Sequence, residues 1–287
     1  NKAMIAHHGF SLSKLAEDNN VTLQFEAAVA GGIPAIKILR EGLAGNQIET
    51  VAGILNGTCN YILSEMTSSN SAFPDVLKEA QHKGFAEADP SFDIDGVDAA
   101  HKLAILSAIA FEQKIEFSSL SISGIRHVSD IDINYAAKLG YCLKLLGIAQ
   151  RGGPAEVTMA LIPDDEQLAL VNGALNAVSY SGAPVQSSIC IGPGAGAGPT
   201  SSAVLADLID ISRGLANYAY GSPVDLLSEQ KLASQTSKEQ CYYLRIAVTD
   251  KPGVLSQISA VLRDHGLSIA SMIQNGQSED GPVFLVL

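Results

Sequence analysis

The chain has 287 residues, a length that suggests about two domains. With 47% hydrophobic and 17% charged residues it can bury a sizeable core, which excludes disorder as its main state. The 30 acidic residues outnumber the 18 basic ones and give a net charge of −12, whereas nucleic acids and anionic membranes attract clustered positive charge. We therefore expect neither a nucleic-acid partner nor a membrane partner.

Apolar runs and cysteines favour a soluble protein. The longest apolar runs, such as residues 103–111, fall well short of the ~18 residues that a membrane span needs. The four cysteines lie far apart in the sequence and match neither a CxxC motif nor a dense disulfide framework. We predict a cytoplasmic protein whose thiols are free and buried.

Both ends of the sequence fall inside predicted elements. Residues 2–8 have the pattern of a helix start, and residues 282–287 have that of a strand within a sheet. We therefore expect the natural polypeptide to continue on both sides.

The first third of the chain alternates between helices and apolar runs. A predicted helix at 11–19 precedes residues 21–29, which read as a buried strand closing an α/β unit. Pro34 suits the first turn of a following helix. We further predict a strand at 48–55, a turn at Asn56-Gly57, and helices at 58–65, 74–83 and 98–113.

The remainder is predicted to form strands, a helix and a second small unit. Residues 141–150 and 156–162 alternate as paired strands do, and strands at 175–180 and 182–191 follow. A helix is expected at 200–215, and the polar residues 218–240 are interpreted as a linker. Beyond it, a strand at 241–249, a helix at 253–265 and strands at 268–275 and 283–287 give the β-α-β-β order that begins a ferredoxin-like unit.

The densest polar cluster runs from Glu87 to Lys102 and holds five carboxylates and one lysine. Asp98 and Lys102 are four residues apart at the start of a predicted helix, so they share one face. A capped helix with an ordinary ion pair is one interpretation. The other is catalytic, because a lysine at the edge of an apolar helix can meet a polar substrate in a restricted cavity and exchange a proton with it.

A glycine-rich stretch, Gly192-Pro-Gly194-Ala-Gly196-Ala-Gly198, precedes the predicted helix at 200–215. It does not match GxGxxG. Glycines before a helix N-terminus let backbone N–H groups approach an anion, and a flexible loop is the alternative interpretation.

Glu26 lies within an apolar run directly after Phe25. A buried charge must be paired or bound to a cation. Backbone carbonyls near Gly31 can complete an oxygen site for an ion, and an ion pair with Lys37 is the alternative.

The segment from Asp250 to Leu255 has the sequence Asp-Lys-Pro-Gly-Val-Leu and joins a predicted strand to a helix. Such a turn exposes backbone amides at the helix N-terminus, which favours the carboxylate of a small ligand. An ordinary β–α turn is the alternative.

Taken together, these motifs closely resemble the homoserine dehydrogenase family over residues 1 to about 215. They occur in that family's order: Asn1-Lys2-Ala, Glu26-Ala-Ala-Val, Ile54-Leu-Asn-Gly-Thr-Cys-Asn-Tyr-Ile62, Gly84-Phe-Ala-Glu87-Ala-Asp-Pro90, Asp93-x-x-Gly96-x-Asp98-Ala-Ala-x-Lys102-Leu and Gly194-Ala-Gly196. From Cys241 on, the chain resembles an ACT domain, as in the monofunctional form of that enzyme.

The resemblance implies a mixed α+β and α/β fold in four parts. Residues 1–28 are the tail end of a Rossmann nucleotide-binding domain, the rest of which lies outside the sequence. Residues 29–217 form a mixed-sheet catalytic and dimerisation domain, residues 218–240 a linker, and residues 241–287 an incomplete ferredoxin-like ACT regulatory domain.

The resemblance also implies roles for individual residues. Lys102 looks like the general acid and base at the substrate oxygen, with Asp98 as its partner. The other implied sites are substrate binding by Glu87, Asp93 and Thr58, cofactor binding by Lys2, Gly194, Gly196 and Gly198, a sodium site of Glu26 with the carbonyls of Val29, Gly31 and Ile33, and a regulatory site of Asp250, Gly253 and Leu255.

The reaction implied by the resemblance is the reduction of L-aspartate 4-semialdehyde to L-homoserine with NADPH or NADH. That reaction belongs to threonine, methionine and isoleucine biosynthesis, and feedback by threonine at the ACT domain is expected. A homodimer or homotetramer is also expected. Two other functions stay open: a non-catalytic protein that senses an amino acid, and a dehydrogenase of another small aldehyde.

Overall fold

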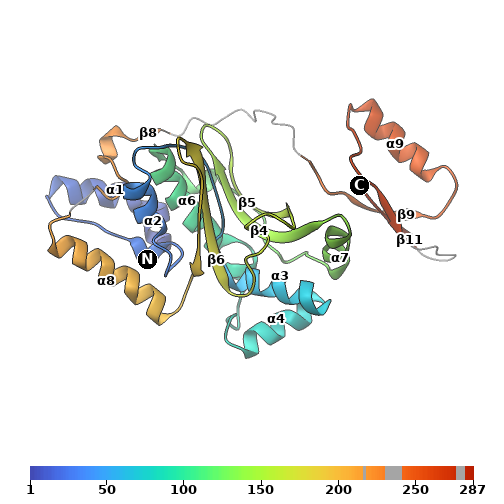
Figure 1. Ribbon diagram of the computed structural model, residues 1–287, viewed down its shortest axis with the longest axis horizontal. Helices are drawn as coiled ribbons and strands as arrows, with labels where there is room; N and C mark the ends of the chain where they lie inside the picture. Colours follow the sequence, from blue (N-terminus) through green and yellow to red (C-terminus); the bar gives the residue numbers. More distant parts are fainter. Residues whose placement is uncertain (216–217, 230–240, 276–281) are drawn as a thin grey trace.

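The computed structural model describes residues 1–215, 218–229, 241–275 and 282–287. Figure 1 shows a large sheet with helices around it, and a small sheet with one helix at the C-terminal end of the molecule. The large sheet is mixed, with strand order β3-β5-β4-β1-β6-β7. Its strands are β1 Gln47–Ile54, β3 Ser121–Ile122, β4 Tyr141–Gln150, β5 Ala155–Pro163, β6 Leu175–Ala183 and β7 Gln186–Pro193.

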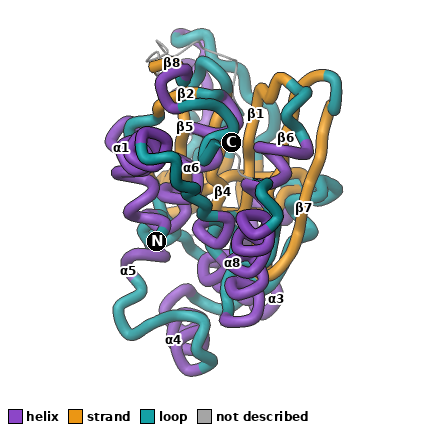
Figure 2. Tube along the Cα trace, turned by 90° about the vertical axis from the view of Figure 1, so that its left-hand side faces the viewer, coloured by secondary structure: helices purple, strands orange, loops and turns teal. Residues whose placement is uncertain are grey.

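Helices pack on this sheet and around its edges. Helix α6 contacts β1, β4 and β5, and α3 contacts β4 and β6. Figure 2 shows α1 beside α6 on one side of the molecule, away from β6 and β7. The helices are α1 Lys2–Asp18, α2 Ala35–Lys37, α3 Gly57–Ser69, α4 Phe73–His82, α5 Ser91–Ile94, α6 Val97–Phe111, α7 Asp130–Lys138, α8 Ala197–Ser212 and α9 Val254–Asp264.

Helix α6 is the centre of the core. Every residue from Asp98 to Phe111 is buried, which matches the apolar character all round that a central helix requires. The sheet presents alternate residues to it, so that Leu145 of β4 joins the core around α6 while Leu146 joins a smaller cluster on the opposite face. Any polar side chain at the start of α6 is therefore held inside the protein.

The prediction of a strand at residues 21–29 is wrong. Residues 21–25 have no regular structure, and Glu26–Ala28 form one turn of 3-10 helix. Phe25, Ala28 and Val29 are nevertheless buried. An apolar run specifies burial, but a strand also needs a neighbouring strand for its backbone hydrogen bonds, and none of the described strands pairs with this segment.

The first part of the segment expected to be a linker packs against the large domain. Tyr220, Val224 and Leu227 are buried in the core, and β8 (Ser228–Glu229) pairs with β2 (Gln113–Lys114). Residues 230–240 lie outside the described residues. The expectation of buried thiols holds for Cys59 but not for Cys241, which is exposed.

The C-terminal unit has the predicted β-α-β-β order. Its sheet has the order β10-β11-β9, with β9 Arg245–Thr249, β10 Ile273–Asn275 and β11 Pro282–Val286. Arg245 forms an ion pair with Asp132 of α7, with Nε 2.7 Å from Oδ1, and Tyr243 donates a hydrogen bond to the same carboxylate at 2.9 Å. These contacts tie the unit to the large domain.

No helix in the described part of the chain combines the length and apolar character that crossing a bilayer requires.

Because α6 packs at the centre of the core, shortening a fully buried side chain on it is expected to lower the free energy of unfolding strongly. Leu103 is 0% exposed and packs where β4 approaches α6 at Gly147. Leu103→Ala should lower the free energy of unfolding by roughly 2–5 kcal/mol, measured by urea denaturation. The control Leu15→Ala removes a side chain that is 61% exposed and should change it by less than about 0.5 kcal/mol. Equal effects of the two substitutions would contradict the central position of α6.

Candidate active site

The site forms where α6 begins, next to the end of β1. Gly96 precedes α6 with φ +84°, a conformation that favours glycine, and Asp98 follows in the first turn of the helix. Lys102 lies one turn further on. Both side chains point toward the end of β1, because Lys102 reaches the carbonyl of Leu55 directly after that strand.

A buried carboxylate connects two lysines. Lys102 Nζ lies 2.6 Å from Asp98 Oδ2, and Lys2 Nζ lies 2.9 Å from Asp98 Oδ1. The side chains of Asp98 and Lys102 are 6% and 10% exposed, whereas that of Lys2 is 34% exposed. Burial by itself raises the pKa of Asp98, but the two ammonium groups outweigh burial and hold this pKa below its ordinary value. Asp98 is therefore an anion near neutral pH.

Lys102 has one N–H group left over. Its ammonium donates to Asp98 Oδ2 at 2.6 Å and to the carbonyl of Leu55 at 2.6 Å. An ammonium has three donors, and the third finds no acceptor among the residues that the structure describes. A buried, oriented cation with a free donor is suited to bind an oxygen atom of a ligand.

Asn56 organises the carboxylates around this cation. Its Nδ2 donates to Asp98 Oδ2 at 2.9 Å and to Asp93 Oδ1 at 2.8 Å, and its Oδ1 accepts from the backbone N–H of Cys59. It thus caps α3 and bridges two acidic side chains at once. Burial, together with the neighbouring Asp98 anion, raises the pKa of Asp93 despite the hydrogen bond from Asn56.

The glycine-rich loop of residues 192–198 is linked to the Leu55 carbonyl through Asn176. Asn176 Nδ2 donates to that carbonyl at 3.0 Å, and the backbone of Gly194 rests on the Asn176 side chain. Gly196 has φ +113° and precedes α8 without a side-chain cap, so backbone N–H groups at the start of α8 remain available to an anion. The space around Gly198 is open.

The side chains of two predicted substrate residues, Thr58 and Glu87, make no hydrogen bond with Asp98, Lys102 or Asn56 in the described part of the chain. Thr58 Oγ1 donates to the carbonyl of Phe85 at 2.7 Å, which ties the start of α3 to the loop after α4. Glu87 is exposed, and its side chain makes no hydrogen bond or ion pair with the described residues. Its backbone carbonyl accepts from Gln81 at 3.0 Å. The structure thus leaves the carboxylate of Glu87 free for a ligand.

Glu26 is buried, and its carboxylate meets backbone rather than a lysine. Its two oxygens accept from the N–H groups of Ile36 and Lys37 at 3.0 and 2.9 Å. Burial, with a smaller contribution from nearby Asp207, raises the pKa of Glu26 to about 7 against the lowering effect of these two hydrogen bonds. The alternative of an ion pair with Lys37 is wrong, because the Lys37 ammonium pairs with Asp210.

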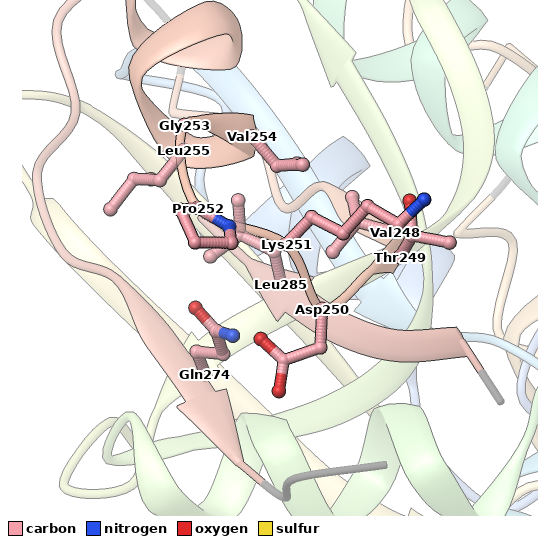
Figure 3. Close-up of a pocket in the computed structure, with 10 residues that line it drawn as sticks. All are labelled: Val248, Thr249, Asp250, Lys251, Pro252, Gly253, Val254, Leu255, Gln274 and Leu285. Carbon is pink, nitrogen blue, oxygen red and sulfur yellow. The ribbon is translucent and has the colours of Figure 1, made fainter. Parts of the chain in front are cut away.

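The predicted regulatory residues line one cavity of about 290 Å³ in the C-terminal unit. Asp250, Gly253 and Leu255 come from the turn and the start of α9, and Gln274 comes from β10. Figure 3 shows the side chains of Asp250 and Gln274 near each other beside this turn. A carboxylate, an amide and a helix N-terminus therefore face one small hollow.

Three polar residues of the site region were not predicted. The sequence places Asn56 in a turn and in a motif of the family without giving it a role, and its position as a helix cap is the available signal. Asn176 and His101 carry no local signal, because their contacts join distant segments. His101 Nε2 lies 3.1 Å from His7 Nε2, its ring stacks on Phe117, and burial together with His7 lowers the pKa of His101.

The depressed pKa of Asp98 predicts a pH-dependent contribution to stability. This contribution is present above the unfolded-state pKa of about 3.8 and is lost as the pH falls through the lower folded-state pKa. Asp98→Asn should therefore lower the free energy of unfolding by on the order of 3 kcal/mol at pH 7. The gap to the unsubstituted protein should shrink below about pH 4.

Urea denaturation at several pH values measures this gap, with Asp18→Asn in an exposed ion pair as the control. A gap of the same size at every pH would contradict the ion-pair network.

Comparison with known proteins agrees with the motifs and with the fold. The homoserine dehydrogenase family model matches residues 34–209, and the ACT domain model matches residues 242–287. Homoserine dehydrogenase of Pseudomonas aeruginosa is 46% identical over 298 aligned positions, covering 100% of this chain and 68% of the relative. Homoserine dehydrogenase of Neisseria gonorrhoeae is 48% identical, covering 96% of this chain and 66% of the relative. The chain thus spans about two thirds of the length of these relatives.

Solved structures give the same result. A homoserine dehydrogenase from Thiobacillus denitrificans superposes with a TM-score of 0.85 at 44% identity, covering 100% of this chain and 67% of the other. A hyperthermophilic archaeal homoserine dehydrogenase in complex with NADPH superposes with a TM-score of 0.66 at 31% identity, covering 76% of this chain and 64% of the other. The chain belongs to the homoserine dehydrogenase family and carries an ACT domain at its C-terminal end.

Proposed function

We propose that the protein reduces L-aspartate 4-semialdehyde to L-homoserine, with Lys102 as the general acid. One observation carries this proposal: the Lys102 ammonium is buried, two of its donors are held by Asp98 and the Leu55 carbonyl, and the third is unassigned within the described residues. In the reduction of an aldehyde, negative charge develops on the carbonyl oxygen. A fixed cation with a free N–H group stabilises that charge and delivers the proton.

The neighbouring residues keep Lys102 ready for this step. Asp98 remains ionised because Lys102 and Lys2 hold its pKa below the ordinary value, so it orients the ammonium without taking its proton. Asn56 also restricts the position of the Asp98 carboxylate, because its Nδ2 donates a hydrogen bond to Oδ2. In the reverse reaction, the same lysine, once neutral, accepts the proton of the homoserine hydroxyl.

The substrate also carries an α-ammonium group, and acidic side chains suit it. We assign this role to Glu87, which is exposed and makes no ion pair with the described residues, and to Asp93, which Asn56 links to Asp98. Thr58 positions the Glu87 loop through the Phe85 carbonyl. Assays that compare aspartate 4-semialdehyde with a neutral aldehyde of the same length separate this proposal from a dehydrogenase of another small aldehyde.

A bound nicotinamide dinucleotide supplies the hydride. The uncapped start of α8 and the open space at Gly198 fit such a group, because they leave backbone N–H groups accessible. We assign cofactor contacts to Gly194, Gly196 and Gly198, and to Lys2 at the edge of the site. Both NADP and NAD remain candidates.

The Glu26 region also fits a sodium ion. The carbonyls of Val29 and Gly31 receive no hydrogen bond from the described residues, and the Glu26 carboxylate keeps acceptor capacity beyond its two backbone partners. We propose that Glu26 and the carbonyls of Val29, Gly31 and Ile33 hold the ion. Its charge would offset the repulsion between Glu26 and Asp207.

A homodimer or homotetramer is proposed as the assembly. Apolar side chains at the β6–β7 side of the sheet support it, because Leu175 and Ile191 are 39% and 50% exposed. Exposed apolar residues that gather on one surface favour association.

The catalytic proposal predicts a large loss of activity when the Lys102 cation is removed. Lys102→Met keeps an unbranched side chain that is one atom shorter but removes the proton donor, so kcat for aspartate-semialdehyde-dependent oxidation of NADPH should fall at least about 100-fold. Lys114→Met removes a partly exposed lysine that pairs with Glu229, and should leave kcat unchanged. Unchanged turnover in the Lys102 variant would exclude Lys102 as the general acid.

We further propose that the C-terminal cavity binds threonine as a feedback effector. The N-terminus of α9 suits the effector's α-carboxylate, and the carboxylate of Asp250 suits its α-ammonium group. Gly253 has φ +94° and lets the chain turn sharply into α9. Leu255 lines the same cavity beside these polar groups.

This assignment predicts that Asp250→Asn weakens threonine binding roughly tenfold or more, because a charged hydrogen bond is lost. Isothermal titration calorimetry with threonine measures the effect. Asp264→Asn changes an exposed aspartate paired with Arg263 and serves as the control. Equal affinities of the two variants would place the effector elsewhere.

A further inference from the structure

Asn176 lies at the meeting point of the glycine-rich loop and the catalytic lysine. It belongs to β6, pairs with Gly192 across the β6–β7 ladder, and is 1% exposed. Nothing in its local sequence requires an amide there, since neighbouring buried positions of β6 carry Ala177 and Val178. A buried amide needs an explanation from its contacts.

The first contact joins Asn176 to Lys102 through one atom. Asn176 Nδ2 donates to the Leu55 carbonyl at 3.0 Å, and Lys102 Nζ donates to the same oxygen at 2.6 Å. A carbonyl oxygen has two lone pairs, so these donors use its full acceptor capacity. The position of the Leu55 carbonyl, and with it that of the ammonium, therefore depends on both.

The second contact joins Asn176 to the glycine-rich loop. A Cβ atom on Gly194 would lie 2.1 Å from Cγ, 2.2 Å from Oδ1 and 2.3 Å from Nδ2 of Asn176, so the loop backbone rests directly on the amide group. On its other side the loop meets Gly31 and Gly32: the Pro193 carbonyl accepts from the Gly32 N–H at 3.0 Å. The loop is thus held between this segment and the Asn176 side chain.

The third observation is a buried acceptor without a partner. Asn176 Oδ1 is buried and receives no hydrogen bond from the described residues. An unpaired buried oxygen costs free energy, which an aliphatic side chain of similar shape would avoid. The amide is therefore explained by its donor rather than by packing alone.

We propose that Asn176 is a positioning residue that sets the distance between the glycine-rich loop and the Lys102 ammonium. It supports Gly194 with the plane of its amide and fixes the Leu55 carbonyl with its Nδ2. This inference rests on the proposed reaction, in which the loop holds the dinucleotide and Lys102 holds the aldehyde oxygen. A hydride and a proton then reach the same carbonyl group only if these two parts keep their spacing.

The first experiment measures the loop itself and requires no activity. Asn176→Ala should raise the amide hydrogen-exchange rate of Gly32, whose N–H bonds to the Pro193 carbonyl, and of residues 194–196, because the loop loses its support. Met66→Ala removes a fully buried side chain from α3 and is the control for general destabilisation. If both variants change exchange at Gly32 equally, or neither does, the positioning role is wrong.

A pair of substitutions tests the contact between the loop and the amide. Gly194→Ala alone should lower the melting temperature, because its Cβ collides with the Asn176 amide. In the double variant Asn176→Ala/Gly194→Ala the new methyl group occupies the vacated space, so part of the loss should be recovered. Losses that simply add would overturn the contact.

Kinetics then separate positioning from folding. Asn176→Asp keeps the shape and removes the donor to Leu55, so kcat should fall roughly 10- to 100-fold while KM for aspartate semialdehyde stays nearly constant. Met66→Ala should not lower kcat to this extent once expressed per folded molecule. Unchanged kcat in Asn176→Asp would overturn the inference. A lack of turnover in every variant and in the unsubstituted protein would instead reject the proposed reaction, and the hydrogen-exchange experiment would then decide whether Asn176 positions the loop.

Discussion

The site depends on holding the Lys102 ammonium group in a buried position on the largely apolar helix α6. Lys102 occupies a helix whose other residues are almost entirely buried, and such a cation is stable only when anions and carbonyl dipoles replace its lost water. Asp98 supplies the anion and Leu55 the carbonyl, both at 2.6 Å. The surrounding architecture can be understood as the means of bringing these two acceptors to one nitrogen.

The two acceptors are brought to Lys102 in different ways, one within the same helix and the other from a distant segment of the chain. Asp98 is local, since one turn of helix separates it from Lys102. The Leu55 carbonyl is non-local: it becomes available because β1 ends at Ile54 and the chain turns into α3, whose N-terminus Asn56 caps. The same turn lets Asn56 bridge Asp98 and Asp93, so one asparagine serves both the helix start and the electrostatics of the site.

The parts that sequence predicts well are those with local causes. The alternation in β4 and β5, the periodicity of α4 and the i,i+4 spacing of Asp98 and Lys102 follow from neighbouring residues. The segment at 21–29 shows the limit, because its apolar residues are buried as expected while its backbone lacks a strand partner among the described residues. Asn176 shows the same limit at the site: its partners Leu55 and Gly194 lie on other segments, and no pattern around position 176 indicates them.

A comparison of Lys102 with Lys144, the other buried lysine among the described residues, distinguishes a structural role from a chemical one. Lys144 of β4 is 1% exposed, and its ammonium donates to three neutral oxygens, of Asn60, Val171 and Asn172. Burial lowers the pKa of Lys144, and the three acceptors use all of its donors.

Lys102 is also buried, but it faces a carboxylate and keeps one donor without an acceptor in the described part of the chain. Lys144, whose three donors are all used, holds the segment around Val171 against the sheet. Lys102, which has one unused donor and lies next to an anion, retains the capacity to bind and protonate an oxygen atom. Buried charge alone is thus a poor indicator of catalysis, and the number of unused donors is the feature that sets Lys102 apart.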